Sequence, residues 1–181
     1  KQYTPLQGKQ VIHRTLERLH AVSELSGILV GVAAETDLTL SDPSTGRLKV
    51  EAYIGGATRS ETVLKGLKRL IDCGRVDEWA LIHDAARPLI TPELVSELVN
   101  SVGFDARGGF LAIEVVDTLK KGKNGRSLET IDRGQHWRAQ TPQLFPVGRL
   151  FDALCAGEEK NITFTDEANA MEFLGYAPLL V

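Results

Sequence analysis

Short apolar segments alternate along this chain with segments in which apolar residues recur every three or four positions. The apolar segments are typical of β-strands and lie at 28–33, 79–82, 110–116 and 177–181. Helical spacing follows Lys9, Thr58, Thr91, Pro146 and Thr165. This order predicts an α/β fold of three layers, in which helices cover both faces of a Rossmann-like, twisted and mostly parallel sheet.

Size and composition indicate one globular domain spanning residues 1–181. The net charge of −3 gives no support for nucleic acid or an anionic membrane as a partner. No apolar run approaches the roughly 20 residues of a membrane span. The two cysteines, Cys73 and Cys155, lack CxxC spacing, so we expect reduced thiols in a cytoplasmic protein.

Capping residues mark where several helices begin. Thr58 with Glu61 three residues later fits a capping box. Thr91 is expected to cap the next helix, with Pro92 at its first position. Thr165, taken alone, is expected to cap the last helix. The remaining local expectations are a loop over 1–8, a turn over 42–46 and a strand over 48–54.

The polar segment from Thr118 to Arg133 differs from the rest of the chain. Asn124-Gly125 at its middle predicts a β-hairpin. Because an isolated hairpin is marginal in water, we interpret 118–135 as a projecting arm that pairs with a second copy of the chain. The basic residues near its tip fit a solvated hairpin, whereas Arg133 at its base could reach a phosphate. The tip residues are Lys120, Lys121, Lys123 and Arg126.

A candidate site follows the strand at 79–82, which we expect to be buried. Ligands of open α/β sheets bind beyond the carboxyl ends of the strands, where Asp84 and Arg87 stand. The small Ala85 and Ala86 between them would allow a ligand to approach the backbone. The structural alternative is that Asp84 satisfies loop amides and Arg87 pairs with Asp84 or with a helix end.

Gly55-Gly56 before a capped helix is a second candidate. Glycine lets the chain run close to a phosphate or a base, and helix amides favour anions. Taken alone, the pair is better explained by an ordinary strand-to-helix turn, and neither GxGxxG nor GxxxxGK[ST] is matched. Three threonines at element ends could cap helices or donate hydrogen bonds to a phosphate: Thr118, Thr141 and Thr165.

Several other chemistries lack their sequence signatures. None of the four histidines has the spacing of HExxH, and no CxxC accompanies them, so a tight zinc site is not expected. No GxSxG or Cys/His arrangement points to covalent catalysis. The residues alone therefore predict an α/β domain with an anionic-ligand site and a dimer arm, without naming the reaction.

Taken together, the motifs resemble those of the 2-C-methyl-D-erythritol 4-phosphate cytidylyltransferases, over essentially the whole chain. In family order they are Lys1-Gln2-Tyr3, Leu6-Gln7-Gly8-Lys9, Gly55-Gly56-x-x-Arg59, His83-Asp84-Ala85-Ala86-Arg87-Pro88, Asp117-Thr118-Leu119-Lys120, Asp132-Arg133, Thr141-Pro142-Gln143 and Thr165-Asp166-Glu167. The resemblance implies a cytoplasmic homodimer of the non-mevalonate isoprenoid pathway. It would join CTP to methylerythritol phosphate with release of pyrophosphate, using a divalent metal, usually Mg²⁺.

The resemblance also implies a role for each matching residue. Lys1 and Arg133 would be catalytic, stabilising the CTP phosphates and fixing the substrate phosphate respectively. Asp84 would hold the sugar phosphate or the metal. Those around CTP would be Gly55, Gly56, Thr62 and Ala85, and those around the sugar phosphate would include Arg87, Thr118, Thr141 and Thr165. The partner subunit would supply Arg87, Thr118 and Arg133.

The sequence departs from the family pattern at three places. The family's glycine-rich stretch before Lys1 and its lysine-containing segment after Val181 are not in this sequence, and we expect both in a longer protein. Thr62 stands where serine is more usual, which keeps the hydroxyl. Two alternatives stay open, ribitol-5-phosphate cytidylyltransferase and a nucleotide-binding module without catalysis.

Overall fold

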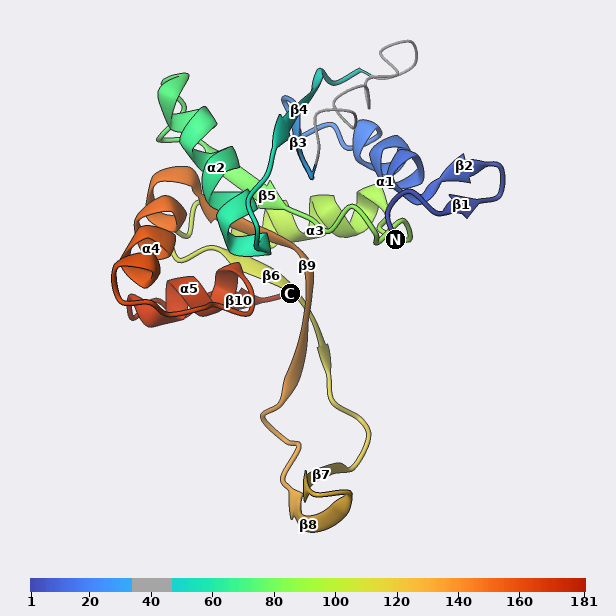
Figure 1. Ribbon diagram of the computed structural model, residues 1–181, viewed down its shortest axis with the longest axis vertical. Helices are drawn as coiled ribbons and strands as arrows, with labels where there is room; N and C mark the ends of the chain where they lie inside the picture. Colours follow the sequence, from blue (N-terminus) through green and yellow to red (C-terminus); the bar gives the residue numbers. More distant parts are fainter. Residues whose placement is uncertain (34–46) are drawn as a thin grey trace.

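A computed structural model describes residues 1–33 and 47–181 (Figure 1), so the turn expected at 42–46 lies outside the described residues. Its larger sheet has four strands in the order β10 (Leu179–Leu180), β6 (Gly109–Glu114), β9 (Trp137–Pro146) and β5 (Trp79–Ile82). β10 is parallel to β6, but β9 is antiparallel to both of its neighbours. The expected α/β fold is therefore present, but the sheet is mixed and not clearly Rossmann-like: β10, β6 and β5 run in one direction and β9 runs in the other. β9 runs the other way because it returns from the arm that β6 leads into.

Helices cover both faces of this sheet, as the α/β prediction required. On one face lie α2 (Arg59–Asp72), α4 (Val147–Glu159) and α5 (Glu167–Phe173), packed around the fully buried Phe145. On the other lies α3 (Pro92–Val102), packed on Leu144. Phe145 and Leu144 are neighbours in β9, and their side chains point to opposite faces because successive residues of a strand alternate.

A second sheet pairs β3 (Ile28–Val32) with β4 (Val50–Ile54) in parallel. The helix α1 (Val11–His20) packs against it through Ile12 and Leu16. The loop expected over 1–8 contains a small hairpin, formed by β1 (Pro5–Leu6) and β2 (Lys9–Gln10). Its turn uses Gln7 and Gly8, both with positive φ.

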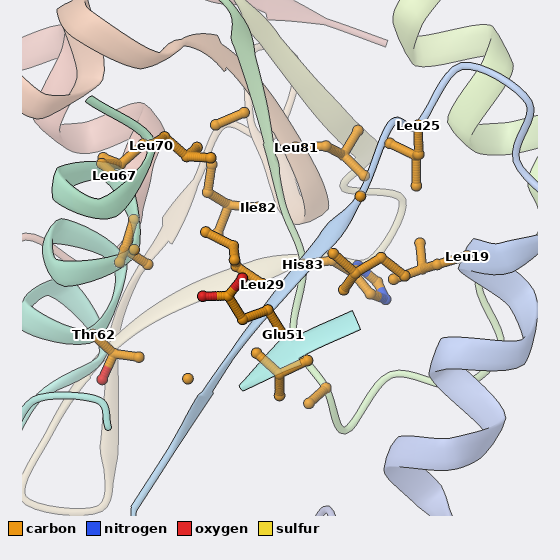
Figure 2. Close-up of a pocket in the computed structure, with 18 of the residues that line it drawn as sticks. Leu19, Leu25, Leu29, Glu51, Thr62, Leu67, Leu70, Leu81, Ile82 and His83 are labelled. Atoms are coloured by element: carbon orange, nitrogen blue, oxygen red, sulfur yellow. The ribbon is translucent and has the colours of Figure 1, made fainter. Parts of the chain in front are cut away.

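A wide cleft lies between the two sheets, lined by β3 of one and β5 of the other. β5 and β3 were both expected to be buried, yet none of the four β5 residues is buried and three of the five β3 residues are at least partly exposed. Each is an edge strand of its sheet, and residues of both line a cleft of about 1760 Å³. Figure 2 shows Leu29 of β3 and Leu81 and Ile82 of β5 around it. The strands were predicted correctly, but their burial was not.

The helix starts agree with two of the three predicted caps. The Thr58 hydroxyl accepts a hydrogen bond from Glu61 N at 3.1 Å, and the Thr91 hydroxyl accepts one from Leu94 N at 3.4 Å. The cap of α5 is Asp166, whose carboxylate accepts from Asn169 N at 2.9 Å. The assignment of this cap to Thr165 was therefore wrong.

The predicted hairpin is present and projects far from the body (Figure 1). β7 (Leu119–Lys123) pairs with β8 (Arg126–Ile131), and both Asn124 and Gly125 have the positive φ that a type I′ turn requires. Nearly every arm residue is exposed. In the part of the chain that the structure describes, no helix has the length and apolar character needed to cross a bilayer.

Candidate active site

The glycine pair between β4 and α2 is held against the first turn of the helix. Gly56 N donates to the Thr62 hydroxyl at 2.9 Å, and that hydroxyl donates to Thr58 O at 2.9 Å. A Cβ on Gly55 would lie 2.8 Å from the Thr62 oxygen, and one on Gly56 would overlap Glu61. The sequence Gly55–Thr62, which we call the glycine loop, therefore needs both glycines for packing. Thr62 is a structural part of this loop as well as a candidate ligand residue.

Asp84 lies between two guanidinium groups. Arg59 Nε donates to one of its carboxylate oxygens at 3.2 Å, and Arg87 Nε donates to the other at 2.9 Å. Arg87 also donates to Gln140 Oε1 at 2.7 Å. The pairing of Asp84 with Arg87, which was the structural alternative at this loop, is thus observed. It does not block a ligand, because a carboxylate has about four lone-pair sites.

The charge of Asp84 is stabilised in spite of its partial burial. Burial opposes ionisation, but the guanidinium groups of Arg59 and Arg87 outweigh it and hold the pKa of Asp84 below its usual value. The neighbouring His83 has its pKa lowered by burial, so its imidazole favours the neutral form. At the Asp84 loop the cleft therefore presents a carboxylate whose ionised form is favoured and which is flanked by positive charge.

Six of the predicted site residues line the same cleft. Lys1 reaches it from the start of the chain and lines it together with residues of the Asp84 loop and the glycine loop. Ala85 is held there by its carbonyl, which accepts a hydrogen bond from the buried Thr15 hydroxyl at 2.9 Å. The six are Lys1, Gly56, Thr62, Asp84, Ala85 and Arg87. Gly55 adjoins them through its close contact with Thr62.

Two predicted threonines do not line this cleft. Thr141, in β9, accepts a hydrogen bond from Asp84 N through its hydroxyl at 3.4 Å. Thr165 lines a separate, shallow hollow together with Asp166 and Trp137. Since Asp166 caps α5, the exposed Thr165 side chain is not needed for capping.

The remaining two predicted residues lie on the arm. Thr118 precedes β7 and is exposed, and Arg133 follows β8, where its guanidinium donates to Val116 O. Neither lines the cleft. The structure therefore does not bring the arm residues to the cleft within one chain.

Arg59 and Glu167 were missed as individual site residues. Arg59 Nη1 donates to Glu167 Oε1 at 2.5 Å, although the two are far apart in sequence. The only sequence signal was their presence in two of the family-like motifs. An ion pair between distant residues has no local pattern, so neither periodicity nor capping could have found it.

No ready-made metal cage is present among residues 1–33 and 47–181, which contain no cluster of three or more His, Cys, Asp or Glu. Mg²⁺ that arrives with a nucleotide needs no such cage, since that ion usually takes one or two carboxylates, water and substrate phosphates. Among the predicted site residues, Asp84 is the carboxylate on the cleft that could hold such an ion, because its lowered pKa favours the ionised form and it keeps free lone pairs.

Comparison with known proteins identifies the family of this chain. A family model described as "IspD: 2-C-methyl-D-erythritol 4-phosphate cytidylyltransferase" matches residues 1–181. The 2-C-methyl-D-erythritol 4-phosphate cytidylyltransferase of Pseudomonas paraeruginosa is 42% identical over 183 residues, which cover 100% of this chain and 78% of the relative. That of Tolumonas auensis is 39% identical over 182 residues, with the same coverage.

Solved structures show the same similarity. A crystal structure of 4-diphosphocytidyl-2C-methyl-D-erythritol synthase superposes with a TM-score of 0.88 at 36% identity, covering 99% of this chain and 83% of that one. The Francisella tularensis 2-C-methyl-D-erythritol 4-phosphate cytidylyltransferase gives a TM-score of 0.86 at 30% identity, covering 100% and 82%. By sequence over its full length and by fold, the chain belongs to the 2-C-methyl-D-erythritol 4-phosphate cytidylyltransferase family.

Proposed function

We propose that this protein transfers the cytidylyl group of CTP to 2-C-methyl-D-erythritol 4-phosphate and releases pyrophosphate. Family membership supports the reaction. The observation in the structure that carries it is the meeting of Lys1, the glycine loop and Asp84 on one cleft. These groups suit the binding of a nucleotide and a second phosphorylated substrate, and they include positive charge, which both substrates require.

The reaction asks the protein for charge and positioning rather than for a nucleophile. A phosphate oxygen of the acceptor attacks the α-phosphorus in line, and pyrophosphate leaves. Since both reactants are anions, cations at the site offset their repulsion. We assign Lys1 to the CTP phosphates and Arg133 to the acceptor phosphate.

The other site residues bind and orient the two substrates. Gly55, Gly56, Thr62 and Ala85 would surround the cytidine, where the glycine loop leaves the backbone accessible. Asp84 would accept hydrogen bonds from the acceptor or hold Mg²⁺, which when bound neutralises charge on the triphosphate. Thr141 and Thr165 would complete the acceptor pocket, together with Arg87 and Thr118.

Steady-state pyrophosphate release tests this assignment. Full-length protein with CTP and Mg²⁺ should release pyrophosphate with methylerythritol phosphate and much less with ribitol 5-phosphate. A preference for ribitol 5-phosphate would identify that compound as the acceptor instead. No pyrophosphate release with either compound would leave only nucleotide binding as the function.

We also propose that the arm joins two subunits and that each site is shared. Apolar side chains at the base of the arm and in β8 are exposed, as expected for an interface that lacks its partner. Ile113 is 48% exposed, Val116 70%, Leu128 60% and Trp137 43%. Because Thr118 and Arg133 lie on the arm, this proposal has them contact substrate in the cleft of the partner subunit. On the Asp84 loop, Arg87 would likewise serve the neighbour.

Mixing inactive variants tests the shared site. Arg133→Ala subunits exchanged with Asp84→Ala subunits should regain activity, because half of the mixed dimers' sites then hold both residues. The same mixture with Arg87→Ala in place of Arg133→Ala tests the role of Arg87. No recovery despite demonstrated subunit exchange would place each whole site within one chain.

Finally, we propose that the single domain formed by residues 1–181 accepts one more apolar strand in the full-length protein, between β3 and β5. Ile28 N donates to Lys49 O in the strand pair with β4, so alternation turns the peptide groups of Leu29 and Gly31 toward the cleft. Beside β5, Val147 N donates to Glu78 O. By the same alternation, the peptide groups of Trp79 and Leu81 also point toward the cleft. In the family, the glycine-rich stretch before Lys1 and the lysine-containing segment after Val181 would supply the remaining cations.

Hydrogen exchange tests the strand proposal directly. The amides of Leu29, Gly31, Trp79 and Leu81 should exchange slowly in the full-length protein and rapidly in the 1–181 fragment. Rapid exchange of all four in both proteins would show that no strand pairs there.

A further inference from the structure

Glu167 is a charged side chain at a place where charge is costly. It is 1% exposed, and its Oε2 has no hydrogen-bond partner among the described residues. Its Oε1 accepts from Arg59 Nη1 at 2.5 Å. A buried carboxylate is tolerated when it is paired, and here a single guanidinium provides the pairing. Burial raises the pKa of Glu167, against the opposing effect of Arg59.

The same guanidinium faces the cleft with its other side. Arg59 Nε donates to Asp84 Oδ1 at 3.2 Å, so one planar group bridges a buried carboxylate and a substrate-side carboxylate. Burial opposes the charge of Arg59, but the two carboxylates outweigh it and raise its pKa. Arg59 is also the first residue of α2, directly after the Thr58 cap. It therefore connects the glycine loop to the Asp84 loop.

The network continues from Glu167 to the acceptor side of the site. The buried Gln143 accepts from Ala168 N at 2.9 Å and donates to Asp166 Oδ2 at 3.1 Å. Gln143 lies two residues after Thr141 in β9, and Asp166 directly follows Thr165. The start of α5 is thus fixed to β9 on one side and to Arg59 on the other.

Resting on the function proposed above, we infer that Arg59 is a positioning residue for Asp84 and that Glu167 holds Arg59 in place. Arg87 does not share this role equally, because its side chain is 47% exposed and also bonds Gln140. Arg59 is tied to a buried carboxylate, and swinging its guanidinium away from this place would leave Glu167 unpaired. The Asp84 carboxylate therefore keeps one fixed oxygen while Arg87 remains available to an anionic substrate.

Lysine at position 59 separates positioning from charge. Arg59→Lys keeps a cation next to Glu167, so the protein should still fold, but an ammonium lacks the planar fork that reaches two carboxylates. In full-length protein we expect the KM for methylerythritol phosphate to rise about tenfold or more, the effect of losing one charged hydrogen bond. The KM for CTP should change less than about threefold, since the glycine loop keeps its own hydrogen bonds. Lys68→Gln removes another α2 cation, paired with Asp72 on the surface, and is the control expected to leave both constants unchanged.

A double-mutant cycle decides whether Arg59 acts through Asp84. Arg59→Lys should have little further effect in an Asp84→Asn background, because the group it positions has already lost its charge. Equal fold-losses in the two backgrounds, or an unchanged acceptor KM in Arg59→Lys, would overturn the inference.

A crystal structure of Glu167→Gln gives a readout independent of activity. The Arg59 and Asp84 side chains should move together, while the contact between Arg87 and Gln140 remains. An unmoved Asp84 would overturn the inference even if the enzyme proves inactive. Absence of wild-type activity would count against the proposed reaction alone.

Discussion

Replacing Thr62 by valine tests how the glycine loop is built. The two side chains have nearly the same shape, so the change removes the hydroxyl with little effect on volume. That hydroxyl accepts from Gly56 N and donates to Thr58 O, both at 2.9 Å. Thr62→Val therefore breaks two hydrogen bonds and leaves the Gly56 amide without its acceptor.

The size of the effect follows from these two bonds. Each contributes about 1 kcal/mol net, and an unsatisfied donor costs about 1–3 kcal/mol where water cannot replace the acceptor. Gly56 is half-buried, so we expect a total of about 2 kcal/mol. If CTP binds only the ordered loop, its KM should rise roughly 30-fold, since 1.4 kcal/mol is a factor of ten.

The assay is pyrophosphate release with CTP varied at saturating methylerythritol phosphate. Thr62→Ser is the matched control, because it keeps the hydroxyl and loses only a methyl group, and its KM for CTP should stay within about threefold of wild type. A Thr62→Val enzyme with the wild-type KM for CTP would refute the reasoning, because the loop would then not need this hydroxyl.

Three further expectations concern stability. Asp166→Ala should lower the free energy of unfolding by about 1 kcal/mol through loss of the α5 cap, whereas Thr165→Ala should leave it nearly unchanged in urea titrations; equal losses would contradict the cap assignment. Gly157→Ala should destabilise by about 1–3 kcal/mol in the same titrations, because its methyl group would overlap the buried Phe164 ring, and an unchanged midpoint would show that the ring can move aside. Burial raises the pKa of Glu167 in the folded protein above the ordinary carboxyl value of 4.5. As pH rises, the Glu167 carboxyl therefore loses its proton at lower pH in the unfolded chain than in the folded protein. The free energy of unfolding should fall as pH rises from 4.5 toward the raised pKa. The difference in unfolding free energy between wild type and Glu167→Gln should therefore vary with pH in that window, and a constant difference would exclude the raised pKa.

Local sequence signals predicted local structure well. Thr58, Thr91 and Asn124-Gly125 were interpreted correctly because a cap or a tight turn depends on residues within a few positions. At the start of α5, Thr165 and Asp166 are adjacent and both suit a cap, so the choice between them depended on backbone geometry.

Features that depend on distant contacts were not predictable in the same way. The direction of β9 follows from the arm that precedes it, and strand sequences carry no sign of direction. The partial exposure of β5 depends on what pairs with its free edge, although Trp-Ala-Leu-Ile has the composition of a buried strand. The ion pair of Arg59 with Glu167 joins the start of α2 to the start of α5, which only the folded chain brings together.

The fate of the α-phosphorus tests the central claim most directly. Full-length protein incubated with Mg²⁺, methylerythritol phosphate and CTP labelled at the α-phosphorus should yield 4-diphosphocytidyl-2-C-methyl-D-erythritol carrying all of the label, with one pyrophosphate for each product formed. Label recovered in CMP, or pyrophosphate released at the same rate without the acceptor, would show hydrolysis at this cleft and contradict the transfer reaction.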